Sequence, residues 1–131
     1  ADMRKLYTEE QPRTKGYSLA FVSPPNPTAP NIFIVDDKWI VVDQEPVRPP
    51  GYQQGDPITI YWALPDGGNY KFQQHGIEIA QHPSFCNPVS DYVFRCAYPR
   101  PMPGTVYKYA IRVRNDATHT NLTDLDPTIW N

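Results

Sequence analysis

The sequence predicts an all-β protein, an antiparallel β-sandwich of about seven to nine short strands. Apolar side chains alternate with polar ones in several runs, as they do in strands with one buried face. No long run has the 3.6-residue period of an amphipathic helix. Sixteen of the 131 residues are proline, against a usual proportion of about 5%, and prolines and glycines separate the alternating runs. Short strands divided by such turns are typical of sandwiches and barrels.

Length and charge limit the classes of function that the chain can have. With 131 residues it has the length of one domain. The 12 basic and 14 acidic residues give a net charge of −2, without the basic excess of nucleic-acid-binding domains, so neither DNA nor RNA is expected as a partner. No stretch approaches the roughly 18 apolar residues of a membrane-spanning helix, and the protein is predicted not to span a membrane.

The first thirty residues are predicted to form an extended N-terminal arm, and residues 31–131 the sandwich. Residues 1–15 are polar and have no sustained period, whereas residues 16–22 alternate as a strand. Residues 23–30, SPPNPTAP, favour an extended polyproline-like linker.

Two β-branched strands, residues 31–35 and 38–43, are predicted to form a hairpin around the Asp36–Asp37 turn. Both faces of this hairpin are apolar, because Trp39 and Val41 alternate with residues that are equally apolar. We therefore expect one face to pack on another sheet and the other face to be covered by the arm or by a partner.

The clearest strand spans residues 57–64, in which every second residue from Ile58 onward is apolar. Two short strands, residues 69–72 and 76–80, are predicted after the following turn. Residues 127–131 are predicted to add an edge strand at the end of the chain.

Residues 91–114 contain two further strands, which are predicted to form a β-hairpin with a proline-rich connection. The tyrosine-rich strand at residues 107–113 and the tryptophan of the central strand, Trp62, resemble the aromatic core of immunoglobulin-like Greek-key domains. Cys86 and Cys96 lie too close in sequence for the inter-sheet bridge of those domains, so the resemblance concerns architecture alone.

Cys86 and Cys96 flank a predicted strand-turn-strand segment and are predicted to form a local disulfide. This bridge would place the protein in an oxidising compartment, secreted or periplasmic. Two buried reduced thiols are the alternative.

The segment from Cys96 to Met102 resembles the copper loop of cupredoxins, in which Cys, His and Met lie between two late strands. The resemblance implies copper ligands at Cys96 and Met102. The loop histidine is absent: no histidine lies between Cys96 and Met102, and position 101 is proline. The resemblance thus implies a degenerate cupredoxin-like protein, and no metal or cofactor is predicted.

The other candidate metal ligands do not have the sequence separation of a metal-binding motif. His75 and His82 are too far apart for a compact pair, and they are predicted to be unrelated surface residues. The acidic and amide residues near the C-terminus lack the pattern of a calcium loop and are predicted to be solvated turn residues. They are Asn115, Asp116, Asn121, Asp124 and Asp126.

No nucleophile elbow, paired catalytic acids or phosphate-binding glycine loop is recognisable, so the protein is not predicted to be an enzyme. The segment from Asn121 to Thr123 is a formal glycosylation acceptor.

The nine tyrosines and three tryptophans exceed what one small core needs, and they favour a binding role. The leading hypothesis is a structural or protein-binding subunit of a larger extracellular or periplasmic assembly, docked through the arm. A carbohydrate-binding module that uses exposed Tyr and Trp is the main alternative. The residues predicted to contact a partner are Trp39, Val41, Tyr52, Tyr61, Tyr98 and Trp130.

Overall fold

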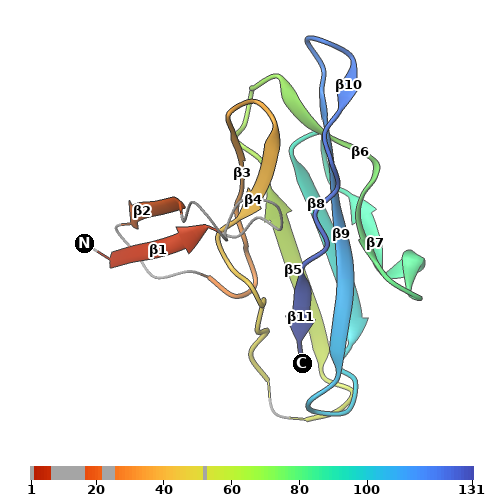
Figure 1. Ribbon diagram of the computed structural model, residues 1–131. Coiled ribbons are helices and arrows are strands. Elements are labelled where there is room, and N and C mark those ends of the chain that lie inside the picture. The colour runs from red at the N-terminus through yellow and green to blue at the C-terminus, as the bar shows by residue number, and fades with distance from the viewer. Residues whose placement is uncertain (1, 7–16, 22–25, 52) are drawn as a thin grey trace.

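The computed structural model describes residues 2–6, 17–21, 26–51 and 53–131, the first two ranges as backbone. This part of the chain is nearly all β, and its sheets are antiparallel (Figure 1). It contains no helix long and apolar enough to cross a membrane. The predicted all-β class is confirmed, and the arrangement of the sheets fits a sandwich.

Strands and one short 3-10 turn follow one another along the described chain (Figure 1). Their bounds are β1 (Asp2–Leu6), β2 (Tyr17–Phe21), β3 (Ile32–Val35), β4 (Trp39–Val42), β5 (Pro57–Ala63), β6 (Tyr70–Ile79), η1 (Pro83–Phe85), β7 (Cys86–Pro88), β8 (Val93–Pro99), β9 (Val106–Asn115), β10 (Thr120–Asn121) and β11 (Thr128–Trp130).

One principal sheet has the strand order β5–β8–β7. The segment before β3 extends this sheet beyond β5. The amide of Tyr61 donates to the carbonyl of Thr28 at 2.9 Å, and the amide of Ala63 donates to the carbonyl of Pro30 at 3.2 Å. The stretch predicted as an extended polyproline-like linker is therefore bonded to the sheet from Thr28 to Pro30.

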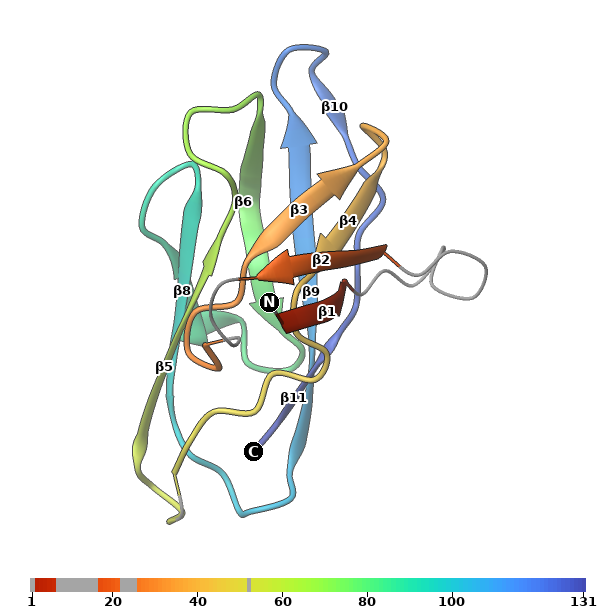
Figure 2. The same ribbon diagram turned by 90° about the vertical axis from the view of Figure 1, so that its left-hand side faces the viewer.

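The other principal sheet is built around β9, which pairs with β6 on one side and with β10 and β11 on the other. Val47 extends it beyond β11, where its amide donates to Thr128 at 3.1 Å and its carbonyl accepts from Trp130 at 2.9 Å. Figure 2 shows the β5–β8 and β6–β9 pairs in separate layers. Buried side chains from both layers form a single core cluster.

An aromatic contact joins the two sheets at the centre of this core. The indole Nε1 of Trp62 on β5 donates to the hydroxyl oxygen of Tyr109 on β9 at 3.2 Å. The two ring centroids are 5.0 Å apart, and both side chains are almost fully buried. The predicted inward faces of these strands are confirmed.

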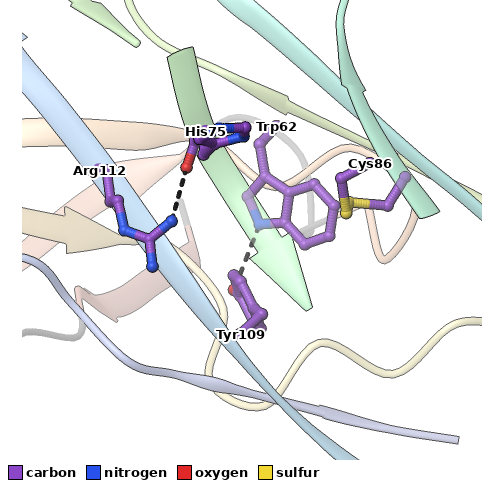
Figure 3. The surroundings of a disulfide bond; sticks show 6 residues. Trp62, His75, Cys86, Tyr109 and Arg112 are labelled. Atoms are coloured by element: carbon purple, nitrogen blue, oxygen red, sulfur yellow. Dashed lines mark hydrogen bonds between the residues drawn. A yellow bond between two sulfur atoms is a disulfide. The ribbon is translucent and has the colours of Figure 1, made fainter. Parts of the chain in front are cut away.

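The predicted disulfide is present, and it joins Cys86 of β7 to Cys96 of β8. The two cysteines are direct partners in the antiparallel register, so the bridge lies within one sheet. In Figure 3 the indole of Trp62 lies beside the bridge, with its nitrogen directed toward Tyr109.

The predicted hairpin in residues 91–114 is wrong in its pairing. Its first strand, β8, pairs with β5 and β7, whereas its second strand, β9, pairs with β6, β10 and β11. The proline-rich connection therefore crosses from one sheet to the other. Alternation along a strand identifies the buried face, but it does not identify the neighbouring strand.

The other predicted hairpin is confirmed. Strands β3 and β4 pair from Ile32 with Val42 to Val35 with Trp39. Asp36 and Asp37 form the turn with φ values of 55° and 53°, the left-handed conformation that short hairpin turns require. The edge strand predicted near the C-terminus is also present, as β11.

At the N-terminus, β1 pairs antiparallel with β2, from Asp2 opposite Phe21 to Leu6 opposite Tyr17. Strand β2 matches the predicted strand at residues 16–22. Strand β1 lies within residues 1–15, where the sequence has no sustained period, because backbone pairing needs no side-chain period.

Strand β6 merges the two short strands predicted at residues 69–72 and 76–80. Phe72 pairs with Val113, and Ile77 pairs with Ile111. Residues 73–76 therefore stand opposite a single residue of β9 and form a wide bulge. Such a bulge bends an edge strand and discourages pairing with another sheet.

Replacing Tyr109 with Phe removes the hydroxyl that accepts the indole hydrogen bond and keeps the ring. We expect the free energy of unfolding to fall by about 1–3 kcal/mol, because a buried N–H loses its acceptor. Urea denaturation measures the change. Tyr61→Phe is the control, because it removes an exposed hydroxyl from the outer face of β5. Its free energy of unfolding should stay within about 0.5 kcal/mol of the wild-type value. Equal stability of the two variants would contradict the inter-sheet role of Tyr109.

Replacing Gly76 with Ala should destabilise the bulge of β6. A Cβ atom at Gly76 would lie 2.7 Å from the Cβ of Phe72, and relief of this overlap in a packed core costs about 1–3 kcal/mol. Gly68→Ala is the matched control, since its nearest contact would be the Pro65 carbonyl oxygen at 3.7 Å. Thermal unfolding of both variants measures the difference in stability. If the Gly76 variant unfolds at the same temperature as the Gly68 variant, the expected overlap with Phe72 is refuted.

Candidate functional site

Two of the residues predicted to bind a partner are exposed on the described surface. Tyr61 is 42% exposed and Trp130 is 47% exposed. Trp39 is half-buried, and the Lys38 ammonium lies 4.8 Å from its ring centroid. Tyr52 lies outside the described residues. Tyr61 and Trp130 are thus the predicted positions with aromatic surface available to a ligand.

Two other predicted contact residues, Val41 and Tyr98, are buried within the chain. The partner contact predicted for Tyr98 does not fit its position, because it belongs to the inward face of β8 and is only 4% exposed. Its hydroxyl donates to Asn131 Oδ1 at 2.8 Å, and its ring lies 5.5 Å from Phe85 and 5.4 Å from Tyr107. Burial raises the pKa of Tyr98 above its ordinary value. These features make Tyr98 a core residue.

Trp130 and Val106 form an exposed pair on the outer face of the β9 sheet. They are direct cross-strand partners between β11 and β9, and Val106 is 51% exposed. The guanidinium of Arg48 lies over the Trp130 ring, 4.8 Å from its centroid, in a cation–π arrangement. We call Arg48, Val106 and Trp130 the Trp130 patch.

The backbone under the Trp130 patch is held by hydrogen bonds on both sides. Next to Arg48, the peptide groups of Val47 bond to β11 as described above. Beyond Trp130, the Asn131 amide donates to the Thr105 carbonyl at 3.0 Å, and the Gly104 amide donates to the Asn131 carbonyl at 2.7 Å. A surface fixed in this way loses little conformational entropy when it binds.

Sequence reasoning identified Trp130 but missed its two neighbours. Val106 could have been found, because it precedes inward-facing Tyr107 and must point to the outer face of the same strand. Arg48 could not have been found from its position in a loop. Its place over Trp130 depends on the parallel pairing of Val47 with Ile129, which no local pattern encodes.

Charged side chains on the same sheet are largely engaged with one another. The Lys71 Nζ lies 3.0 Å from Asp116 Oδ2, and the Arg114 Nε lies 3.2 Å from Asp116 Oδ1. Hydrogen bonding from Lys71, and then from Arg114, lowers the pKa of Asp116 below its ordinary value. The group is a surface ion-pair network that ties β6 to β9.

A second network centres on Arg112 of β9. Its Nη1 donates to Glu78 Oε1 at 3.1 Å. The same nitrogen donates to the His75 carbonyl at 3.1 Å (Figure 3). Its Nε donates to Asp124 Oδ2 at 3.2 Å. One arginine therefore fastens the bulge of β6 and the segment before β11 to the central strand.

The candidate metal ligands do not converge. No three His, Cys, Asp or Glu side chains of the described ranges are grouped so that they could hold a metal ion. The His82 ring stacks on Phe85, with centroids 4.5 Å apart. Because Cys96 is bonded to Cys86, it has no thiolate to offer, and the copper ligand implied by the cupredoxin resemblance is lost.

A surface pocket of about 390 Å³ lies between β6 and the turn before β8. Its charged residues are Asp91 and Arg114. Asp91 lies 3.9 Å from Lys71, and Arg114 is paired with Asp116.

Comparisons with known proteins do not place the chain in a family. A scan against protein-family models gave no match, and a search of curated proteins gave none either.

Replacing Lys71 with Gln should raise the carboxyl pKa of Asp116 toward 3.8, its ordinary value. The pair stabilises the fold above that pH, and its contribution is lost as the pH falls through the lowered folded-state pKa. Titration of the side-chain carboxyl signal by NMR measures the shift. Lys108→Gln is the control, because the Lys108 ammonium donates to the backbone carbonyl of Asp126. The same pKa of Asp116 in the wild type and the Lys71 variant would contradict the pairing.

Proposed function

We propose that this protein is a non-enzymatic β-sandwich that binds another protein in a larger extracellular or periplasmic assembly. The observation that carries the proposal is the Trp130 patch, where an exposed indole lies beside Val106 and beneath Arg48. Tryptophan and arginine are among the residue types that contribute most to protein interfaces. Such a surface on a rigid sheet favours a role in recognition.

The finer architecture that we propose is an immunoglobulin-like Greek key. The strand orders β5–β8–β7 and β6–β9–β11 resemble the two sheets of such domains, in which strands from separate parts of the chain alternate between layers. The Trp62 side chain packed beside a disulfide also supports the resemblance, although this bridge lies within one sheet. Function on such a fold resides in its surface sites, so the recognition role that we propose rests on the Trp130 patch and not on the architecture.

Residues 1–30 are the second contact that we propose. An N-terminal segment can add a strand to the sheet edge of a neighbour through main-chain hydrogen bonds. The pairing of β1 with β2 supports the capacity of this region to form strands. The arm and the Trp130 patch would then engage one partner at two places.

The disulfide supports the extracellular or periplasmic location that we propose. Disulfides persist in oxidising environments such as the periplasm and the extracellular space, and Cys86 and Cys96 are bridged. The absence of an enzymatic role is likewise a proposal. It is supported by the ion pairs that occupy many charged groups of the β9 sheet.

Native mass spectrometry of the protein isolated from its source tests the proposal. We expect a stoichiometric complex with a second protein. Trp130→Ala should weaken this complex by about tenfold or more, as loss of a central aromatic anchor does, and deletion of residues 1–22 should abolish it. Circular dichroism should stay that of a β protein in both variants.

Tyr107→Phe is the matched control for the Trp130 variant, since it changes an aromatic residue on the inward face of the same strand pair. It should leave the complex intact. A protein that is monomeric in its source, or a complex unaffected by both the substitution and the deletion, would refute the proposed function.

A further inference from the structure

The outer face of the other sheet carries a row of three polar side chains that the proposed function does not use. Tyr61 on β5 is the direct cross-strand partner of Arg95 on β8, and Arg95 is in turn the partner of Asn87 on β7. All three are exposed. Because neighbouring strands lie about 4.8 Å apart, the row spans roughly 10 Å.

The neighbours of Tyr61 on its own face are mostly small. Thr59 and Ala63 lie beside it on β5, and Ala97 and Val93 are its diagonal neighbours on β8. In an antiparallel pair, these positions are the ones that could crowd a ring. Tyr61 remains 42% exposed.

Arg95 is a charged group that the rest of the fold leaves available. It makes no ion pair or side-chain hydrogen bond within the described part of the chain. This distinguishes it from Arg112 and Arg114, which lie on the other sheet and hold carboxylates. No strand position on the outer face of the β5–β8–β7 sheet carries an acidic side chain.

We propose that the row of Tyr61, Arg95 and Asn87 binds an acidic glycan, a polysaccharide built from uronic acid units. The Tyr61 ring can cover the C–H face of a sugar, and the planar guanidinium of Arg95 can hold a carboxylate through two hydrogen bonds. The Asn87 amide can donate to and accept from sugar hydroxyls. The site lies on the opposite sheet from the Trp130 patch and does not depend on it.

The polarity of the row favours a glycan over a protein partner. A protein interface needs an apolar centre that excludes water, and around Tyr61 the face offers threonine, alanine and a single valine. A chain of sugars instead lies along a shallow surface and uses one ring, one cation and one amide in succession. The proposal therefore commits to a glycan.

NMR titration of the folded chain with uronic acid hexamers tests the proposal. The probes are hexagalacturonate, alginate and hyaluronan fragments, and the fully methyl-esterified hexagalacturonate is the uncharged control. We expect at least one acid hexamer to shift the amides of β5, β7 and β8, with weaker binding at higher salt. The ester should bind about tenfold more weakly, because the charge-assisted hydrogen bonds are lost.

Substitutions separate the contributions of the row. Arg95→Gln should remove the preference for the acid over the ester, and Tyr61→Ala should weaken both. Arg48→Gln is the matched control, since it removes an exposed arginine from the Trp130 patch, and it should leave glycan binding unchanged.

Three outcomes would overturn the proposal. They are no shift with any of the acid hexamers, shifts that gather at the Trp130 patch, and equal binding of a polyglutamate peptide. None of them bears on the protein complex proposed above, so the two proposals can fail separately.

Discussion

The contact between Trp62 and Tyr109 is the constraint on which the rest of the sandwich depends. An indole N–H buried between two sheets must find an acceptor, and here the acceptor stands on the opposite sheet. This requirement fixes the spacing of β5 and β9 and the register in which the two inner faces meet. The disulfide beside the indole holds β7 in the sheet that carries Trp62, although β7 is very short and has a single partner strand.

Once both inner faces are fixed, strand alternation decides what the protein presents to its surroundings. Ile129 points inward and is fully buried, so Trp130 must point outward. The same rule places Tyr61 outside because Ile60 and Trp62 lie inside. Tyr61 and Trp130 are therefore exposed because they alternate with buried core residues. The outer faces of the two sheets consequently carry different side chains.

Sequence patterns predicted the inward faces well, because a period of two is local. They also predicted the Asp36–Asp37 turn and the disulfide, which depend on near neighbours. They wrongly paired β8 with β9, because the choice of partner strand depends on the packing of distant strands. They failed for Tyr98 for a related reason, since a tyrosine beside prolines looks exposed until Phe85, Tyr107 and Asn131 close around it.

The arginines on the outer faces of the two sheets differ in whether they are already paired with carboxylates of the fold. Arg112 and Arg114 hold acidic side chains of the fold, so replacing those contacts with a ligand would require breaking existing bonds. Arg48 lies over an indole, and Arg95 has no bonded partner in the described chain, so both guanidinium groups keep hydrogen-bonding capacity for another molecule. In both surfaces that we propose for recognition, an arginine has an aromatic neighbour and no carboxylate partner among the described residues. The Trp130 patch adds an apolar neighbour, Val106, and the Tyr61 row adds the amide of Asn87. This difference is the reason for proposing a protein partner for the first surface and a glycan for the second.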